Sequence, residues 1–369
     1  MTVRVNKPAF NLREKLSELE RPIGLKGSEL MKSETVQDAR DLVSAGRKNL
    51  IINGNPIVYQ RAQTASNIAA YQYHTADRWR FSQSGAGVAN NRVTDMSVVT
   101  DADIAGDFIG NYVRIDHTTA ATSPASNASV GYNYRMEPRD IVPYLGKEMT
   151  LSFYARSNAG IAINSGFVSG TTPSSIILID SNDSSTWITL TSDWKRYKFT
   201  FTLGTTVPST YLDIGIRHQP GIVGHVDMTG IQLERGRNAT EFEHRSYGEE
   251  LALCQRYYEK FSADDTNGGY ATFMTCSKNS NTILVAHPVF RVPKRAPGAT
   301  LTFGGLMRIS NVEEGETSIT LTGANNSQLG THGGYLVLTM TSNSHGNGDA
   351  FRLEGRGDTT AYMAFSSEL

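Results

Sequence analysis

The sequence predicts a mainly β protein: a jelly-roll β-sandwich followed by a smaller β-rich C-terminal domain, with short N-terminal helices and a linking helix. Short segments of alternating apolar and polar residues recur from residue 49 onward, and clusters of Gly, Asn, Ser and Thr separate them. Charged residues are only 19% of the 369, and 34 glycines supply turns. Because this length exceeds the usual size of one domain, we expect two or three.

Residues 1–48 are charged and prone to form helices, and we interpret them as an attachment segment. Asn11 and Glu14 have the spacing of a capping box, and a second short helix is expected to begin at Ser33. The first helix has an apolar face formed by Leu12, Leu16 and Leu19. Because so short a helix is marginal in water, these leucines are predicted to pack on a sister chain or another protein, or alternatively on their own chain.

Residues 49–245 are predicted to form the sandwich. Apolar and polar residues alternate in 149–156, in 196–203 and in 212–216, as in strands with one face in a core. After Met228 the parity of the apolar positions changes, which predicts a β-bulge near Gly230. Strands of this length and spacing suit two packed sheets in a jelly roll.

A helix over residues 246–263 is predicted to link this sandwich to the rest of the chain. Ser246 and Glu249 form a second capping-box pattern at its start. At spacings of three and four, one apolar stripe is expected to comprise Tyr247, Leu251, Cys254, Tyr258 and Phe261.

Residues 264–369 are predicted to form the C-terminal β domain. The expected strands are 282–286, 317–322, 335–340 and 361–365. Three prolines between Pro288 and Pro297 predict an extended edge or loop there. The core looks small, and small domains often bury further faces against symmetry mates, so we expect a trimer.

Several classes of function are disfavoured by composition. A formal net charge of −1 gives no field that attracts nucleic acid. No run of eighteen apolar residues occurs and the first residues lack a secretory apolar core, so we expect synthesis in the cytoplasm without membrane insertion. Two cysteines are too few for a disulfide framework, although a bridge between Cys254 and Cys276 remains an alternative.

No motif for catalysis, metal binding or a cofactor occurs in the sequence, and we predict none of the three. Asp180, Asp183 and Asp193 could converge as the carboxylates of a glycosidase, but we interpret them as turn residues. His74 and Asp77 offer only two metal ligands, which do not make a site.

Sugar binding needs aromatic rings on a polar surface, where they can stack on the apolar faces of sugars. Four rings are predicted to do so, with packing or an interface as the alternative: Tyr132, Tyr134, Tyr154 and Trp187. Trp79 is expected in the core, with an exposed platform as its alternative.

Seven segments stand out in order along the chain: AGRKNLIINGN at 45–55, YQR at 59–61, TADRW at 75–79, LSFYARS at 151–157, WKRY at 194–197, FEHRSYGEELALCQRYY at 242–258 and YMAFSSEL at 362–369. Taken in that order, they resemble bacteriophage tail-fibre proteins that contain a carbohydrate-binding-like domain. As an ordered set these short pieces are specific. Where the family often has Asp and Phe after Asn-Gly, this chain has Asn55 and Pro56, so the loss of a carboxylate argues against a calcium site there.

The resemblance implies a homotrimeric structural protein of the virion, located in the tail or tail fibre. Such a protein would join other tail proteins through its N-terminal segment and adhere to host cell-surface polysaccharide without catalysis, and several linked copies would strengthen weak contacts. Two alternatives stay open, an architectural collar, baseplate or fibre component without sugar binding and a polysaccharide depolymerase. The absence of a long shaft in this sequence favours a stubby fibre or an architectural part.

Overall fold

The computed structural model describes most of the chain after residue 46. The described residues are 32, 47–65, 72–84, 91–96, 104, 111–118, 129–169, 187–208, 210–218, 222–263, 271–311, 315–341 and 345–369. From Asn49 to Leu369 they belong to one compact unit. The predicted attachment segment, with Leu12, Leu16 and Leu19, lies outside the described residues, and its role stays a prediction.

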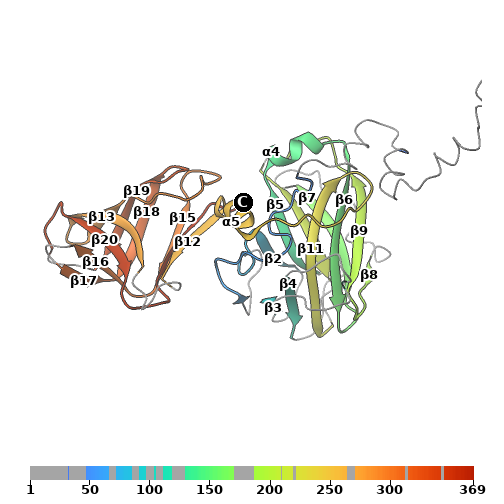
Figure 1. Cartoon of the computed structure of the whole chain (residues 1–369), viewed down its shortest axis with the longest axis horizontal. Helices are drawn as coiled ribbons and strands as arrows, with labels where there is room; N and C mark the ends of the chain where they lie inside the picture. The colour runs from blue at the N-terminus through green and yellow to red at the C-terminus, as the bar shows by residue number, and fades with distance from the viewer. Residues whose placement is uncertain are drawn as a thin grey trace, which may run out of the picture. The chain divides into compact units, whose positions relative to one another are not determined.

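Two antiparallel sheets form the predicted jelly-roll sandwich (Figure 1). The first has six strands in the order β1 (Thr64–Ala65), β3 (Asn91–Met96), β4 (Tyr112–His117), β11 (Gly224–Arg235), β6 (Glu148–Ser157) and β9 (Lys195–Thr202). The second has five in the order β2 (Trp79–Ser84), β5 (Ser129–Met136), β10 (Leu212–His218), β7 (Ala162–Ser169) and β8 (Ile188–Thr189). Between β5 and β6 lie the short helices α4 (Pro138–Ile141) and η1 (Val142–Tyr144). The mainly β fold and the alternating strands read from the sequence are confirmed.

The sandwich core is built from the inward residues of both sheets. Trp79 is 2% exposed and stacks on Tyr132, with ring centres 4.6 Å apart and 4° between the planes. Its indole nitrogen donates to the Asn53 carbonyl at 2.8 Å, which satisfies the one polar atom of the ring. The prediction that Trp79 belongs to the core is therefore confirmed.

Strand β11 contains the predicted bulge. Its pairing with β6 shifts register between Thr229 and Gln232, and Gly230 has a φ of 59°. Glycine adopts this left-handed conformation without a steric penalty, which is why it suits the bulged position. The extra residue changes the parity of the strand and so keeps four side chains in the core: Val226, Met228, Ile231 and Leu233.

Helix α5 (Tyr247–Gln255) begins as predicted but ends early. Ser246 and Glu249 make both hydrogen bonds of the capping box. The predicted continuation to residue 263 is wrong, because Tyr258–Ser262 form strand β12 and pair with β21. The predicted apolar stripe is wrong as well, since the Tyr247 side chain is 59% exposed. In the described part of the chain no helix is long and apolar enough to cross a membrane.

The C-terminal residues form two further antiparallel sheets (Figure 1). Three strands pair in the order β12, β21 (Tyr362–Ser366) and β15 (Thr300–Gly304). Seven pair in the order β17 (Gly315–Ile319), β16 (Met307–Asn311), β20 (Ala350–Gly355), β13 (Thr272–Ser280), β14 (Ile283–Ala286), β19 (Gly334–Met340) and β18 (Leu321–Leu329). The segment predicted as one strand over 317–322 belongs instead to β17 and β18, which lie at opposite edges of the sheet. Pro288–Pro297 is a loop, as the prolines predicted.

His117 predicts a dependence of stability on pH. The ring is 3% exposed, on the core face of β4, and burial lowers its pKa from 6.5 to about 4. Between these values the unfolded chain binds the proton more readily than the folded one, so stability falls as pH drops from 6.5 toward 4, by up to roughly 3 kcal/mol. Denaturant unfolding at pH 7 and pH 4.5 should show this loss, and the His117→Gln variant should lose less. An equal loss in both proteins would contradict the assignment.

Candidate functional site

Two of the predicted sugar-binding rings are core residues. Tyr132 and Tyr134 are each 2% exposed and lie on the inner face of β5, opposite Trp79 and Phe81 of β2. Tyr132 stacks on Trp79, and the Tyr134 hydroxyl accepts a hydrogen bond from the backbone of Ile52 at 3.1 Å. Because a buried ring cannot stack on a sugar, the assignment of these two residues is corrected. Polar neighbours on the strand indicated alternation but not which face is the core.

The other two predicted rings differ from each other. Tyr154 does lie on the outer face of β6, but it is 9% exposed and packs with Trp194 and Phe242, while the Arg196 guanidinium lies 5.6 Å from its ring centre. We therefore interpret Tyr154 as a packing residue. Trp187 is half-buried just before β8, and its role in binding stays a prediction.

A polar and aromatic cluster occupies the outer face of the six-stranded sheet. Strands β4, β6 and β11 and the turn before β9 supply its members, which come from four separate parts of the sequence. We call it the arginine–aromatic cluster, and it comprises Tyr112, Arg114, Arg156, Trp194, His225 and Asp227. Their positions follow from strand alternation, because Val113 and Val226 between them point into the core.

A buried carboxylate organises the cluster. Asp227 is fully buried and accepts two hydrogen bonds from Arg114, from Nε at 2.7 Å and from Nη2 at 2.9 Å. Arg156 donates to the same carboxylate from Nε at 2.9 Å. Both arginine side chains remain partly exposed, at 24% and 22%. Paired donors of this kind fix a guanidinium in place, so the cluster presents rigid N–H groups at the surface.

Aromatic rings flank the two arginines. The rings of Tyr112 and Trp194 meet edge to face with centres 5.5 Å apart, and the Arg156 guanidinium lies 4.7 Å from the Trp194 ring centre. Trp194 is 6% exposed, and its indole nitrogen has no hydrogen-bond partner in the described part of the chain. Tyr112 is half-buried, and the guanidinium carbons of Arg114 and Arg156 each lie 5.8 Å from its ring centre.

The charges of the cluster nearly balance. The hydrogen bonds to Asp227 raise the pKa of Arg114. Burial lowers the pKa of His225, so this imidazole is neutral at pH 7. Asp116, on the same face of β4, acts electrostatically on both Arg114 and His225. Two arginines and two carboxylates beside a partly exposed ring suit a ligand rich in hydroxyl groups rather than a strongly charged one.

Sequence reasoning missed the cluster. The alternation of Tyr112, Arg114 and Asp116 around buried valine and isoleucine was the available signal on β4. His225 and Asp227 repeat it on β11, but the register that places them beside β4 is a tertiary contact. No local sequence motif predicts a site whose residues come from separate strands in this way.

Of the two metal ligands weighed from the sequence, His74 and Asp77, the second is engaged by neighbouring side chains. Asp77 is fully buried and its carboxylate accepts hydrogen bonds from Arg61 at 3.1 Å and from Gln60 at 2.6 Å. Burial raises its pKa to about 6. Among the described residues no group of three or more metal-ligating side chains occurs.

The structure places only some of the remaining candidates. Asp193 lies in the exposed turn before β9, whereas Asp180 and Asp183 lie outside the described residues. Cys254 and Cys276 are free, buried thiols, so the alternative of a bridge between them is excluded. Burial raises the pKa of both, to about 12 for Cys276, which makes them poor nucleophiles.

Comparison with known proteins finds distant structural likeness only. No family model and no curated protein sequence matches the chain. A CBM4 structure is 16% identical with a TM-score of 0.30 and covers 50% of this chain and 98% of its own. The family 11 carbohydrate-binding module of a Clostridium thermocellum cellulosomal cellulase is 12% identical with a TM-score of 0.27, covering 48% and 98%.

A phage protein is also among these structural neighbours. The enzymatically active domain of tailspike protein 4 from bacteriophage CBA120 is 16% identical with a TM-score of 0.30. The match covers 43% of this chain and 19% of the tailspike chain. Identities and scores at this level assign neither a family nor a function.

Proposed function

We propose that this chain is a non-catalytic structural protein of a phage tail or tail fibre that adheres to glycans on the host surface. The observation that carries the glycan part is the arginine–aromatic cluster, in which a half-buried Tyr112 lies beside two arginines fixed by Asp227. Such a surface can stack on one face of a sugar and donate to its hydroxyl groups. The ordered segments that resemble tail-fibre proteins support the virion part.

A homotrimer and attachment through residues 1–48 belong to the same proposal. One cluster per chain offers few contacts, and weak sites linked in one particle act together through a high effective concentration. The oligomeric mass of the purified protein in solution tests this part directly. A monomer that binds a glycan tightly would contradict it.

Replacing Tyr112 with Ala should remove most glycan binding, because the stacking ring is lost while the salt bridges of Asp227 remain. We expect binding to a glycan array to fall at least tenfold relative to the unmodified protein. Tyr247→Ala is the matched control, since Tyr247 is an exposed ring on α5 outside the cluster. Thermal unfolding should show that both variants fold.

Three results would contradict the proposal in different ways. If the fully assembled protein bound no glycan on the array, an architectural role would be favoured. Binding that survives Tyr112→Ala would place the site elsewhere. Release of reducing ends from host polysaccharide would identify a depolymerase.

A further inference from the structure

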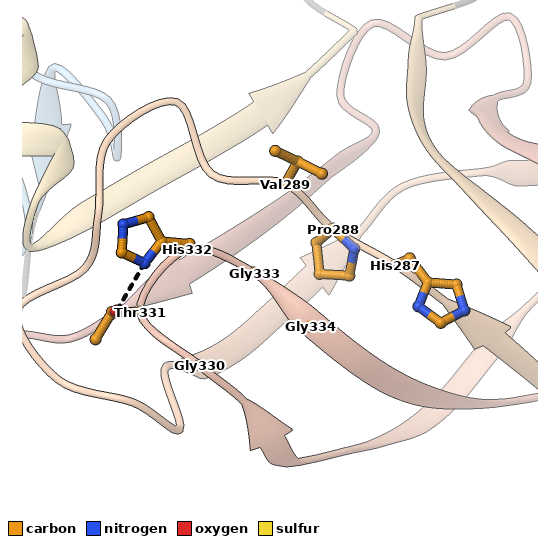
Figure 2. A pocket seen from close by; sticks show the side chains of 8 residues that line it. All are labelled: His287, Pro288, Val289, Gly330, Thr331, His332, Gly333 and Gly334. Carbon is orange, nitrogen blue, oxygen red and sulfur yellow. Dashed lines mark hydrogen bonds between the residues drawn. The ribbon is translucent and has the colours of Figure 1, made fainter.

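A pocket of about 510 Å³ opens on the C-terminal sheets and belongs to none of the sites described so far. Its walls are residues 287–289, which follow β14, and residues 330–334, which form the turn between β18 and β19. Its volume lies within the roughly 300–1,000 Å³ of small-molecule sites. Figure 2 shows the imidazoles of His332 and His287 at opposite ends of the pocket, with Pro288 and Val289 between them.

Backbone hydrogen bonds hold the two walls together. Phe290 donates to the His332 carbonyl at 3.1 Å, and Gly334 donates to the Pro288 carbonyl at 3.3 Å. A Cβ on Gly333 would lie 2.1 Å from the Pro288 oxygen, so only glycine permits this approach. The pocket therefore exists before a ligand binds, which reduces the entropy cost of binding.

The pocket combines an apolar surface with polar ends. The Val289 side chain is 78% exposed, and Pro288 lies next to it in the pocket wall. His287, at one end of the pocket, meets the ring of Tyr335 edge to face at 5.8 Å. At the other end Thr331 Oγ1 lies 3.1 Å from Nδ1 of His332 (Figure 2), which leaves Nε2 to bind a ligand. Exposed apolar and aromatic groups of this kind, ringed by hydrogen-bonding side chains, are typical of recognition surfaces.

The described residues that line the pocket include no Lys, Arg, Asp or Glu. An anionic ligand would lack a cationic partner there, and a cationic ligand would lack a carboxylate. A neutral ligand with one apolar face and several hydroxyl groups matches both the walls and the ends.

We propose that this pocket is a binding site for a neutral pyranose sugar. The apolar face of the sugar ring packs on Val289 and Pro288, and ring hydroxyls bind His332, Thr331 and the exposed backbone of the glycine turn. The site is independent of the arginine–aromatic cluster, so it can bind sugar even where the cluster does not.

Saturation-transfer difference NMR on the full chain tests this proposal. The probes are methyl β-D-glucopyranoside, methyl β-D-galactopyranoside and N-acetylglucosamine, each at tens of millimolar, with glucuronic acid as the charged comparison. We expect transfer to the C–H protons of at least one neutral sugar and at least fivefold less to glucuronic acid. His332→Ala should reduce that transfer at least fivefold when it is compared in the Tyr112→Ala background, in which the arginine–aromatic cluster no longer contributes.

Val289→Asp is the second variant, because the Val289 side chain is 78% exposed and the change should leave folding intact. In the same Tyr112→Ala background it should reduce transfer at least fivefold by placing a carboxylate against the sugar. Tyr112→Ala should leave pocket binding unchanged, which separates this site from the cluster, and Tyr247→Ala is the surface control.

Three results would overturn the proposal. The first is no transfer to any neutral probe, and the second is stronger transfer to glucuronic acid than to the neutral sugars in the Tyr112→Ala background. The third is transfer that both pocket variants leave unchanged in that background. Transfer abolished by Tyr112→Ala but retained by the pocket variants would overturn it while supporting the proposed function of the cluster.

Discussion

Replacing Lys294 with Met is expected to destabilise the folded protein by roughly 3–5 kcal/mol. The side chains of Lys294 and Glu259 are both fully buried, and Nζ lies 2.5 Å from Oε2. Nζ also donates to the Gln255 carbonyl at 2.6 Å. Burial lowers the pKa of Lys294, which the carboxylate opposes. Without the ammonium group, Glu259 keeps Arg291, at 3.9 Å, as its one ionic partner among the residues that the structure describes.

Denaturant unfolding of four proteins measures this effect. The double variant Lys294→Met with Glu259→Met should recover at least half of the loss, because it removes the unpaired buried charge rather than leaving it. Lys195→Met is the matched control, since Lys195 is exposed, and it should change stability by less than about 0.5 kcal/mol. A double variant as unstable as the single one would show that the charge itself is not the cause.

Lys294 also shows where sequence reasoning stops. Three prolines correctly predicted a loop, and a lysine between them reads as solvent-exposed. It is buried because strand β12 brings Glu259 from 35 residues earlier in the chain. Whether a charged side chain is buried depends on such a distant partner, and the local sequence pattern does not identify that partner.

The linking helix illustrates a second limit. Its capping box is local chemistry, and the sequence predicted its two residues correctly. Its end is not local, because Tyr258–Ser262 leave the helix to pair with the last strand, Tyr362–Ser366. A partner about a hundred residues away thus overrides the apolar helical spacing.

The same distinction separates the fold from the candidate site. Alternation predicted the sandwich strands and the bulge at Gly230, since each depends on neighbours in sequence. Alternation did not predict that the face of β5 with Tyr132 points into the core, because it leaves open which face of a strand meets the second sheet. Arg114 and Asp227 are 113 residues apart in the sequence, so alternation predicts the face of each strand separately but not the contact between the two side chains.

Replacing Arg78 with Met should be the other severe substitution, again with a loss of roughly 3–5 kcal/mol. Arg78 is fully buried, binds the Glu368 carboxylate and donates to the Arg135 carbonyl. Its guanidinium carbon lies 3.4 Å from the Tyr257 ring centre, a close cation–π contact. The substitution removes these interactions and leaves Glu368 with Arg61 as its remaining ionic partner, at 3.2 Å.

The matched control is an exposed pair of the same chemistry. Arg237 binds Glu148 at 2.6 Å, but their side chains are 76% and 41% exposed, so Arg237→Met should cost less than about 1 kcal/mol. Hydrogen exchange adds a local readout, because Arg78 joins the start of β2 to the residue that follows β21 by two positions. We expect Arg78→Met to speed exchange in Tyr362–Ser366, whereas Arg237→Met should not. Equal unfolding free energies for the two variants would mean that Arg78 is dispensable to this junction.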